Sequence, residues 1–362
     1  MNISMSERIK EFDRKLRDKE FNAFLITNPT NVYYFTNFFS RSSANLLVIP
    51  GNTPQLYIPE LEYEEAQSKV RFCEVMRLEK KSEIFLEIKG ELEKNQIPKV
   101  GIEDDSMNVK LYQDLTQKYQ FPQLENGSGL IDDLRKVKDK EEADLIKKAC
   151  QMGDKGVAIA LETIEEGKTE IEIAAEVEYV MRKAGSQAIP FETIIASGYR
   201  SAFPHGSSSE KKIDRGDLII IDLGAKCEGY CSDMTRTVVL GKPNPKQLEL
   251  FNLVFKAQQS AIQNCIVGAK AEDVEVKARE ILAEQNYEEY FVHSLGHGVG
   301  LDVHEYPWLS LKSKDVLMEN NILTIEPGVY IPDFGGVRIE DTIVLKKSGP
   351  KILTKAKYEF EI

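Results

Sequence analysis

The sequence lacks several features that would place a protein in a class at once. It has no stretch of about 18 or more apolar residues, so we expect no membrane-spanning helix. The opening run, MNISMSERIKEFDRKL, is polar and charged, so we expect no secretory signal. Lysine and arginine form no long cluster and the net charge is −12, which disfavours nucleic acid and anionic membranes as partners.

Cysteine is also scarce, with five residues in a chain of 362. An odd, scattered set in a chain of this length indicates reduced thiols and a cytoplasmic protein. Cys227 and Cys231 could be a pair of metal ligands. We favour the simpler interpretation that they are two small residues in a hairpin.

The length predicts two domains, because a single core rarely keeps growing to this size. Residues 1–130 have the pattern of an α/β domain without any histidine. Its densest acidic run, Glu103 to Asp105, is interpreted as a solvated loop. The expected elements are helices at 6–18, 60–70, 81–93 and 109–119, a strand at 21–27, and a hairpin at 44–58.

Residues 131–362 predict a second domain in which helix, helix and hairpin occur twice in that order. Thr169 and Glu172 form a capping-box signature at the start of its second helix. The segment Glu170 to Ala175 aligns weakly with Asp273 to Ala278, which supports an internal duplication. The helices are expected at 140–165, 169–184, 245–266 and 272–286.

Each predicted hairpin carries two carboxylates. Asp222 ends the apolar run Leu218 to Ile221, and Asp233 opens a second strand-like run. A hairpin folded about the midpoint of these aspartates has its turn at Cys227 and Glu228, and the two then lie opposite one another or one step off. Like charges that face each other across a ladder are unfavourable, so a cation is expected between them.

The second hairpin repeats this device with Glu326 and Glu340. Pairing them centres the turn on Asp333, within the turn-forming run PDFGG. Two hairpins with paired carboxylates predict one shared site of four carboxylates.

The four histidines, His205, His293, His297 and His304, all fall in the C-terminal domain, which favours a functional site. His293 and His297 have helical spacing, but the glycines around His297 argue against a helix. We expect one of these two to be a ligand and the other to line the pocket. Four carboxylates with one imidazole favour Mn²⁺, with Co²⁺, Fe²⁺ or Zn²⁺ possible. Their charge suits two divalent ions, as in metal-dependent hydrolases.

Five motifs resemble those of the pita-bread metallopeptidases: IIDLGA, SDMTRT, HSLGHGVGLDVHE, TIEPGVY and VRIEDT. The run NPTNVYYFTNF resembles the first domain of the branch that holds prolidases, aminopeptidase P and creatinase. The resemblance implies an α+β chain with a creatinase-like α/β domain, followed by a pseudo-twofold pita-bread α/β catalytic domain. The metal ligands that it implies are Asp222, Asp233, His297, Glu326 and Glu340.

By the same resemblance, Asp222 would bind one metal and His297 with Glu326 the other, while Asp233 and Glu340 would bridge. Glu326 would also be the general base. His205 would reach the proline side of the substrate, and His304 would hydrogen-bond the scissile carbonyl oxygen. His293 and Arg338 would line the pocket; for Arg338, a role as partner of a ligand carboxylate is weighed equally.

The expected function is hydrolysis of the Xaa-Pro bond of dipeptides or short peptides by a homodimeric, prolidase-like enzyme. The alternative is an Xaa-Pro aminopeptidase that acts on longer peptides. A non-catalytic binding protein and a creatinase-like C–N hydrolase are less favoured.

Overall fold

Residues 5–362 are described by a computed structural model, and they divide into two compact units. The first unit ends at Arg135 and the second begins at Lys136. The boundary expected from the sequence, after residue 130, falls within the last helix of the first unit, α6 (Ser128–Arg135). No helix in the described residues is both long and apolar enough to cross a membrane.

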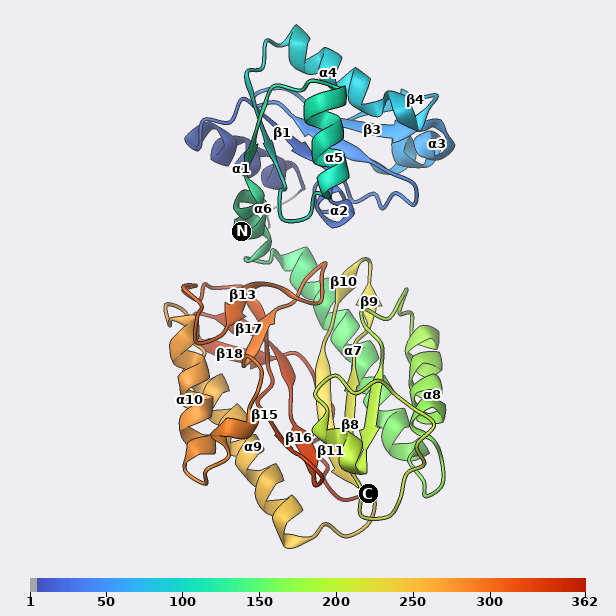
Figure 1. The fold of residues 1–362 in the computed structure, drawn as a ribbon, viewed down its shortest axis with the longest axis vertical. Coiled ribbons are helices and arrows are strands. Elements are labelled where there is room, and N and C mark those ends of the chain that lie inside the picture. The colour runs from blue at the N-terminus through green and yellow to red at the C-terminus, as the bar shows by residue number, and fades with distance from the viewer. Residues whose placement is uncertain (1–4) are drawn as a thin grey trace. The chain divides into compact units, whose positions relative to one another are not determined.

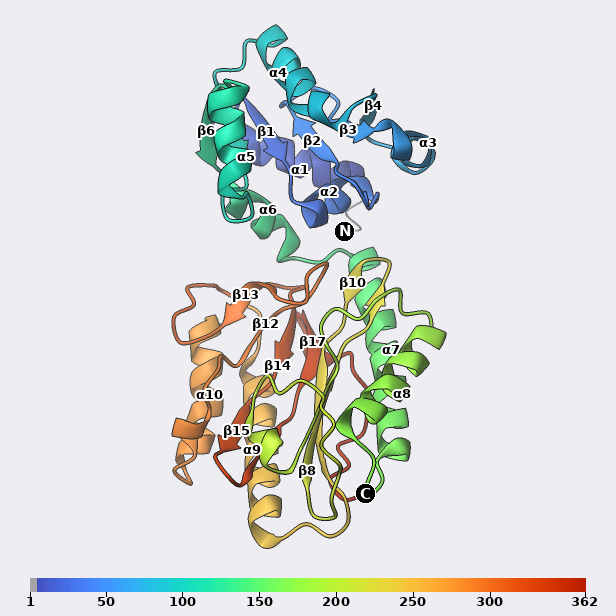
Figure 2. The ribbon, with the colours of Figure 1, turned by 45° about the vertical axis from the view of Figure 1, so that its right-hand side comes forward.

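The first unit is a six-stranded sheet in the order β4-β3-β2-β1-β5-β6, with helices on both faces (Figures 1 and 2). Side chains alternate along β1, so Phe24 packs on Phe12 of α1 while Leu25 packs with Ile88 of α4 on the opposite face. Besides α6, the elements are α1 (Met5–Asp18), β1 (Ala23–Ile26), α2 (Pro29–Thr36), β2 (Asn45–Val48), β3 (Gln55–Pro59), α3 (Glu60–Lys69), β4 (Glu74–Leu78), η1 (Lys81–Glu83), α4 (Ile84–Lys94), β5 (Lys99–Ile102), α5 (Val109–Gln113), η2 (Asp114–Lys118) and β6 (Gln123–Asn126).

The acidic run of the first unit differs from its expected role. Glu103 is only 1% exposed and accepts hydrogen bonds from the backbone N–H groups of Thr27 and Asn28, at 2.7 and 2.9 Å. It also accepts one from the Asn31 side chain at 2.6 Å. The interpretation as a solvated loop is therefore wrong for Glu103, which instead holds the start of α2.

The second unit contains the repeated order of elements that the sequence predicted: α7 and α8 precede one hairpin, and α9 and α10 precede the other. The capping box of Thr169 and Glu172 at the start of α8 is confirmed. The elements before the second helix pair are α7 (Lys140–Thr163), α8 (Glu170–Lys183), β7 (Ile194–Ser197), η3 (Gly198–Ala202), β8 (Leu218–Leu223), β9 (Lys226–Cys227), β10 (Tyr230–Cys231) and β11 (Met234–Val239).

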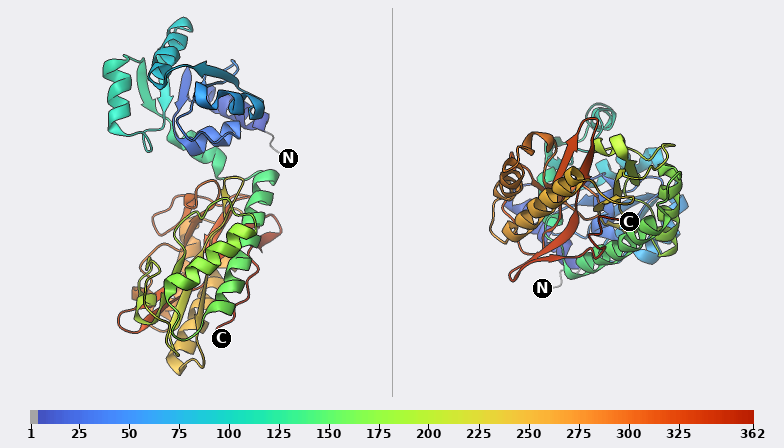
Figure 3. Two further views of the ribbon diagram at one scale, coloured as in Figure 1. Left: turned by 90° about the vertical axis from the view of Figure 1, so that its right-hand side faces the viewer. Right: turned by 90° about the horizontal axis from the view of Figure 1, so that it is seen from below.

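The remaining elements build the other half of this unit around a five-stranded sheet, in the order β13-β12-β14-β17-β18. In the left view of Figure 3, α7 and α8 lie in front of the strands and α9 lies behind them. The elements are α9 (Pro245–Asn264), α10 (Ala271–Ala283), η4 (Glu288–Tyr290), β12 (Gly296–Gly298), β13 (Glu305–Leu309), β14 (Ile322–Ile325), β15 (Gly328–Ile331), β16 (Gly335–Arg338), β17 (Asp341–Lys346) and β18 (Gly349–Ile352).

The first hairpin has a different register from the expected one. Asp222 lies opposite Thr235, two residues from Asp233, so the prediction that the aspartates lie opposite one another or one step off is wrong. The turn residues are Glu228 and Gly229, one position later than expected. Both have positive φ, 46° and 82°, which defines a type I′ turn and suits glycine at the second position.

The second hairpin has the expected register. β14 pairs with β17 and β15 pairs with β16 in one continuous alignment, in which Glu326 and Glu340 are opposite one another. The turn is centred on Asp333, as predicted.

Candidate metal centre

Alternation along the strands of the first hairpin turns both aspartates to the same side. In β8, Ile221 and Leu223 pack against α7 and α8, so Asp222 points to the opposite face. In β11, Met234 packs in the same core, so Asp233 points with Asp222. The helices that bury one face of the hairpin therefore aim its carboxylates at the other.

The second hairpin directs its glutamates in the same manner. Ile325 and Ile339 belong to the core under α9 and α10, and the adjacent Glu326 and Glu340 face away from it. The ladder is interrupted here because Pro327 has no N–H to donate. The N–H groups of the two glutamates instead donate to carbonyls outside the hairpin, at 2.9 and 3.1 Å.

His297 lies in the short strand β12, which confirms that this segment is not a helix. The residue is 4% exposed, and its Nδ1 lies 3.0 Å from the carbonyl oxygen of Gly298. Donation from Nδ1 leaves the Nε2 lone pair facing the carboxylates, 3.2 Å from Glu326 Oε1 and 3.7 Å from Asp233 Oδ2. This tautomer is the one that a metal ligand requires.

The donor atoms fit divalent metal ions. Asp222 Oδ1 and Glu340 Oε1 are buried without a hydrogen-bond partner in the described part of the chain, a costly arrangement unless a cation binds them. Oxygen-rich sets of this kind suit Mn²⁺ and similar ions. Ligand atoms lie within 4.8 Å of one another in three overlapping groups: Asp233, His297 and His304; His297, Glu326 and Glu340; and Asp222, Asp233 and Glu340.

The electrostatics of the carboxylates also call for positive charge. Burial raises the pKa of Asp222, and burial together with the neighbouring acids raises the pKa values of Asp233 and Glu340 well above their usual range. Burial also raises the pKa of Glu326, but a hydrogen bond from the ring of His297 and the charge of Arg338 outweigh it and bring the pKa to about 2; a metal ion on His297 Nε2 would take the place of that ring proton. A bound cation would favour the charged form of all four.

Arg338 joins the two hairpins behind the carboxylates. The residue is 3% exposed, and its guanidinium donates from Nη2 to Asp222 Oδ2 at 2.6 Å and from Nε to Thr235 Oγ1 at 3.1 Å. The Thr235 hydroxyl in turn donates to Glu340 Oε2 at 2.7 Å. Arg338 also lines the cavity, so it combines both interpretations that the sequence left open.

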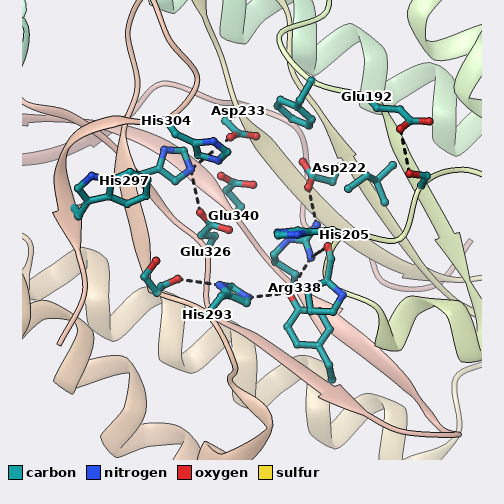
Figure 4. Close-up of a pocket in the computed structure, with 17 residues that line it drawn as sticks. Glu192, His205, Asp222, Asp233, His293, His297, His304, Glu326, Arg338 and Glu340 are labelled. Carbon is teal, nitrogen blue, oxygen red and sulfur yellow. Dashed lines mark hydrogen bonds and ion pairs between the residues drawn. The ribbon is translucent and has the colours of Figure 1, made fainter. Parts of the chain in front are cut away.

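The candidate ligands face a cavity of about 530 Å³ that the other three histidines also line (Figure 4). The ring of His304 lies 4.3 Å from that of His297, and His304 itself is exposed. His293 is half-buried, with Nε2 2.9 Å from the Tyr330 hydroxyl, and His205 is exposed in the loop after η3. The structure thus brings together every site residue that the sequence predicted.

Several lining residues were not anticipated. The hydroxyl of Tyr330 connects His293 to Arg338, because it lies 2.9 Å from His293 Nε2 and accepts a hydrogen bond from Arg338 Nη1 at 2.8 Å. Burial raises the pKa of Tyr330 to about 12. Its even spacing from Glu326 along the hairpin could have identified it. Trp308, Phe191 and Glu192 also line the cavity, but no pattern in the sequence marks them.

Comparison with known proteins identifies the family. Residues 144–347 match metallopeptidase family M24, and residues 8–137 match the creatinase/prolidase N-terminal domain. The chain belongs to metallopeptidase family M24. It is therefore a metallopeptidase with a creatinase-type N-terminal domain and a pita-bread catalytic domain, which confirms the expected fold and enzyme class.

Its relatives match over nearly the whole chain. An Xaa-Pro dipeptidase from Pyrococcus furiosus is 43% identical over 98% of this chain and 99% of its own length. The crystal structure of a prolidase from Pyrococcus horikoshii has a TM-score of 0.92 and 44% identity, covering 97% of this chain and 99% of the other. An X-Pro aminopeptidase from Thermotoga maritima has a TM-score of 0.89 and 34% identity, covering 98% and 99%.

Proposed function

We propose that this metallopeptidase is an Xaa-Pro dipeptidase that uses two divalent metal ions. The observation that carries the proposal is the set of four carboxylates and one imidazole at the cavity, with two buried carboxylate oxygens that lack a partner in the described residues. The substrate class is taken from the full-length relatives that are named Xaa-Pro dipeptidase or prolidase.

The grouping of the donors suggests how two ions would be held. Asp222 would bind one ion, and His297 with Glu326 would bind the other. Asp233 and Glu340 would be shared, since each lies in two of the three groups of donors and offers two carboxylate oxygens, whereas His297, which also lies in two groups, has only Nε2 free to bind an ion. We propose Mn²⁺ because oxygen donors predominate. When bound, the ions would supply an activated water near neutral pH and polarise the carbonyl under attack.

The remaining steps fall to side chains of this chain. Glu326 would accept the proton of the attacking water, because its Oε1 lies beside the site and close to the ring of His297. His304 would donate a hydrogen bond to the carbonyl oxygen as negative charge develops there. His205 and His293 would position the substrate in the cavity, and Arg338 would hold Asp222 in place.

We also propose a cytoplasmic homodimer. Large apolar side chains of the first unit are solvent-exposed in the single chain, with Leu61 at 88%, Val109 at 71% and Phe39 at 62%, and a partner subunit would cover such groups. The five cysteines are free thiols, which supports a reducing compartment. Light scattering at micromolar concentration tests the dimer, and a fully active monomer would refute it.

A second candidate is an Xaa-Pro aminopeptidase, because the X-Pro aminopeptidase from Thermotoga maritima is also similar over its full length. The deciding experiment compares hydrolysis of Ala-Pro and Ala-Pro-Ala by the chelator-treated protein, with and without added Mn²⁺. A dipeptidase cleaves Ala-Pro in preference and only with metal. Preference for Ala-Pro-Ala would support the aminopeptidase, and cleavage of neither peptide would refute both.

A further inference from the structure

Glu192 stands apart from the other acidic side chains of the cavity. Five acidic residues line the cavity, and four of them are the candidate metal ligands Asp222, Asp233, Glu326 and Glu340, whose charge the ions would balance. The fifth, Glu192, is exposed, and no salt bridge to it occurs in the described residues. Its one hydrogen bond within residues 5–362 comes from the Ser207 hydroxyl, at 3.0 Å.

The surroundings of Glu192 suit an aliphatic chain that ends in a positive charge. Figure 4 shows Glu192 on the far side of Asp222 from His297 and His304. Phe191 and Ile194 line the cavity next to it and provide apolar surface. A lysine side chain can bury its methylene groups on such a surface while its ammonium group reaches a carboxylate.

Arg338 does not neutralise Glu192, because its guanidinium is already paired with Asp222 at 2.6 Å. Within the described residues, Glu192 is therefore the acidic side chain of the cavity that has neither a candidate metal nor a salt bridge. A cationic side chain on the residue before proline would find its counter-charge there, with Phe191 and Ile194 beside it.

We propose that Glu192 determines specificity and favours a basic residue before proline. This inference rests on the proposed Xaa-Pro peptidase function. It assigns no role to Glu192 in the chemistry of bond cleavage. The carboxylate would attract a lysine or arginine side chain and repel an acidic one.

The test compares Lys-Pro with norleucyl-proline, which has the same chain length without the terminal ammonium group. In the Mn²⁺-loaded protein, Glu192→Gln should lower kcat/KM for Lys-Pro by roughly 1.5-fold to fivefold relative to norleucyl-proline, the size expected of an exposed ion pair. The change should lie in KM, with kcat nearly constant. Glu192→Lys should make norleucyl-proline the better substrate. In the native protein, high salt should weaken the preference for Lys-Pro.

Glu166→Gln is the matched control, because Glu166 is an exposed glutamate outside the cavity and the change removes the same charge. If Glu192→Gln leaves the ratio of kcat/KM for the two peptides unchanged, the inference is overturned while the proposed function stands. Equal losses on both peptides overturn it as well, because Glu192 would then recognise the α-ammonium group that they share. If the native protein cleaves neither peptide, the proposed function fails and the inference fails with it.

Discussion

The two hairpins of the second unit present the same number of carboxylates with different geometry. In the first, Asp222 and Asp233 are diagonal neighbours, because Asp222 lies opposite Thr235. In the second, Glu326 and Glu340 are directly opposite one another, at a point where the ladder is interrupted. One site is therefore assembled from an offset pair of short acids and an opposed pair of longer ones.

The difference shows which feature of a hairpin matters for this site. A register shift of one residue turns a side chain to the other face, whereas a shift of two residues preserves the face. Both aspartates therefore reach the site although they do not pair. The face is fixed by apolar neighbours such as Ile221 and Ile325, which must stay in the core.

If the hairpins contribute equally, removing one shared carboxylate from either should have the same, and the largest, effect. We expect Asp233→Ala and Glu340→Ala each to lose both ions and nearly all activity. The loss should exceed the roughly 10–100-fold reduction in metal affinity that changes behind the ligands produce. Elemental analysis after Mn²⁺ loading and kcat/KM on Ala-Pro measure this, with Glu166→Ala as a control. Two bound ions in either variant would show that its carboxylate is not a ligand.

The neighbouring histidines distinguish a ligand from a transition-state donor. We expect His297→Ala to lower metal content. His304→Ala should keep both ions but lose roughly 10²–10³ in kcat, the usual cost of one oxyanion donor, with little change in KM. Bound metal, kcat and KM on one Xaa-Pro substrate test this pair. Metal loss in His304→Ala, or a nearly normal kcat, would contradict the assignment.

The Thr235 hydroxyl connects the two hairpins, since it donates a hydrogen bond to Glu340 and accepts one from Arg338. We expect Thr235→Val, which has nearly the same shape, to weaken Mn²⁺ binding by roughly 10–100-fold. Thr235→Ser retains the hydroxyl and should restore most of the affinity. Titration calorimetry of the metal-free proteins measures the difference. Equal affinities in the Val and Ser variants would mean that the hydroxyl does not position the ligands.

Much of the site was predictable because its residues obey strong local rules. The capping box at Thr169, the turn at Asp333 and the non-helical strand at His297 follow from turn and cap chemistry. The predicted register of the first hairpin was wrong because it was derived by pairing Asp222 with Asp233. Gly229, at the second position of a type I′ turn, was the better guide.

Features that depend on tertiary contacts were not predictable in this way. Glu103 sits in an acidic run that reads as solvated, yet backbone N–H groups distant in sequence bury and satisfy it. The helix α2 was also missed, although Asn28 caps it and Pro29 occupies its first position. Trp308 in β13 and Glu192 in the loop before β7 line the cavity, but no pattern in the sequence around either residue indicates this.

The smallest expected effect compares the two turns. Gly229 has φ 82°, so Gly229→Ala forces a Cβ into the left-handed region and should cost about 1–2 kcal/mol. Asp333, with φ 62°, already bears that strain, so Asp333→Ala should cost less. For a unit of this size each kcal/mol lowers Tm by roughly 2–4 °C. Calorimetry of the metal-free proteins measures both shifts, and Gly229→Asn should recover part of the loss, because asparagine tolerates this conformation. Equal shifts for the two alanine variants would mean that the turns do not differ in strain, and that the first hairpin keeps its register by its core contacts alone.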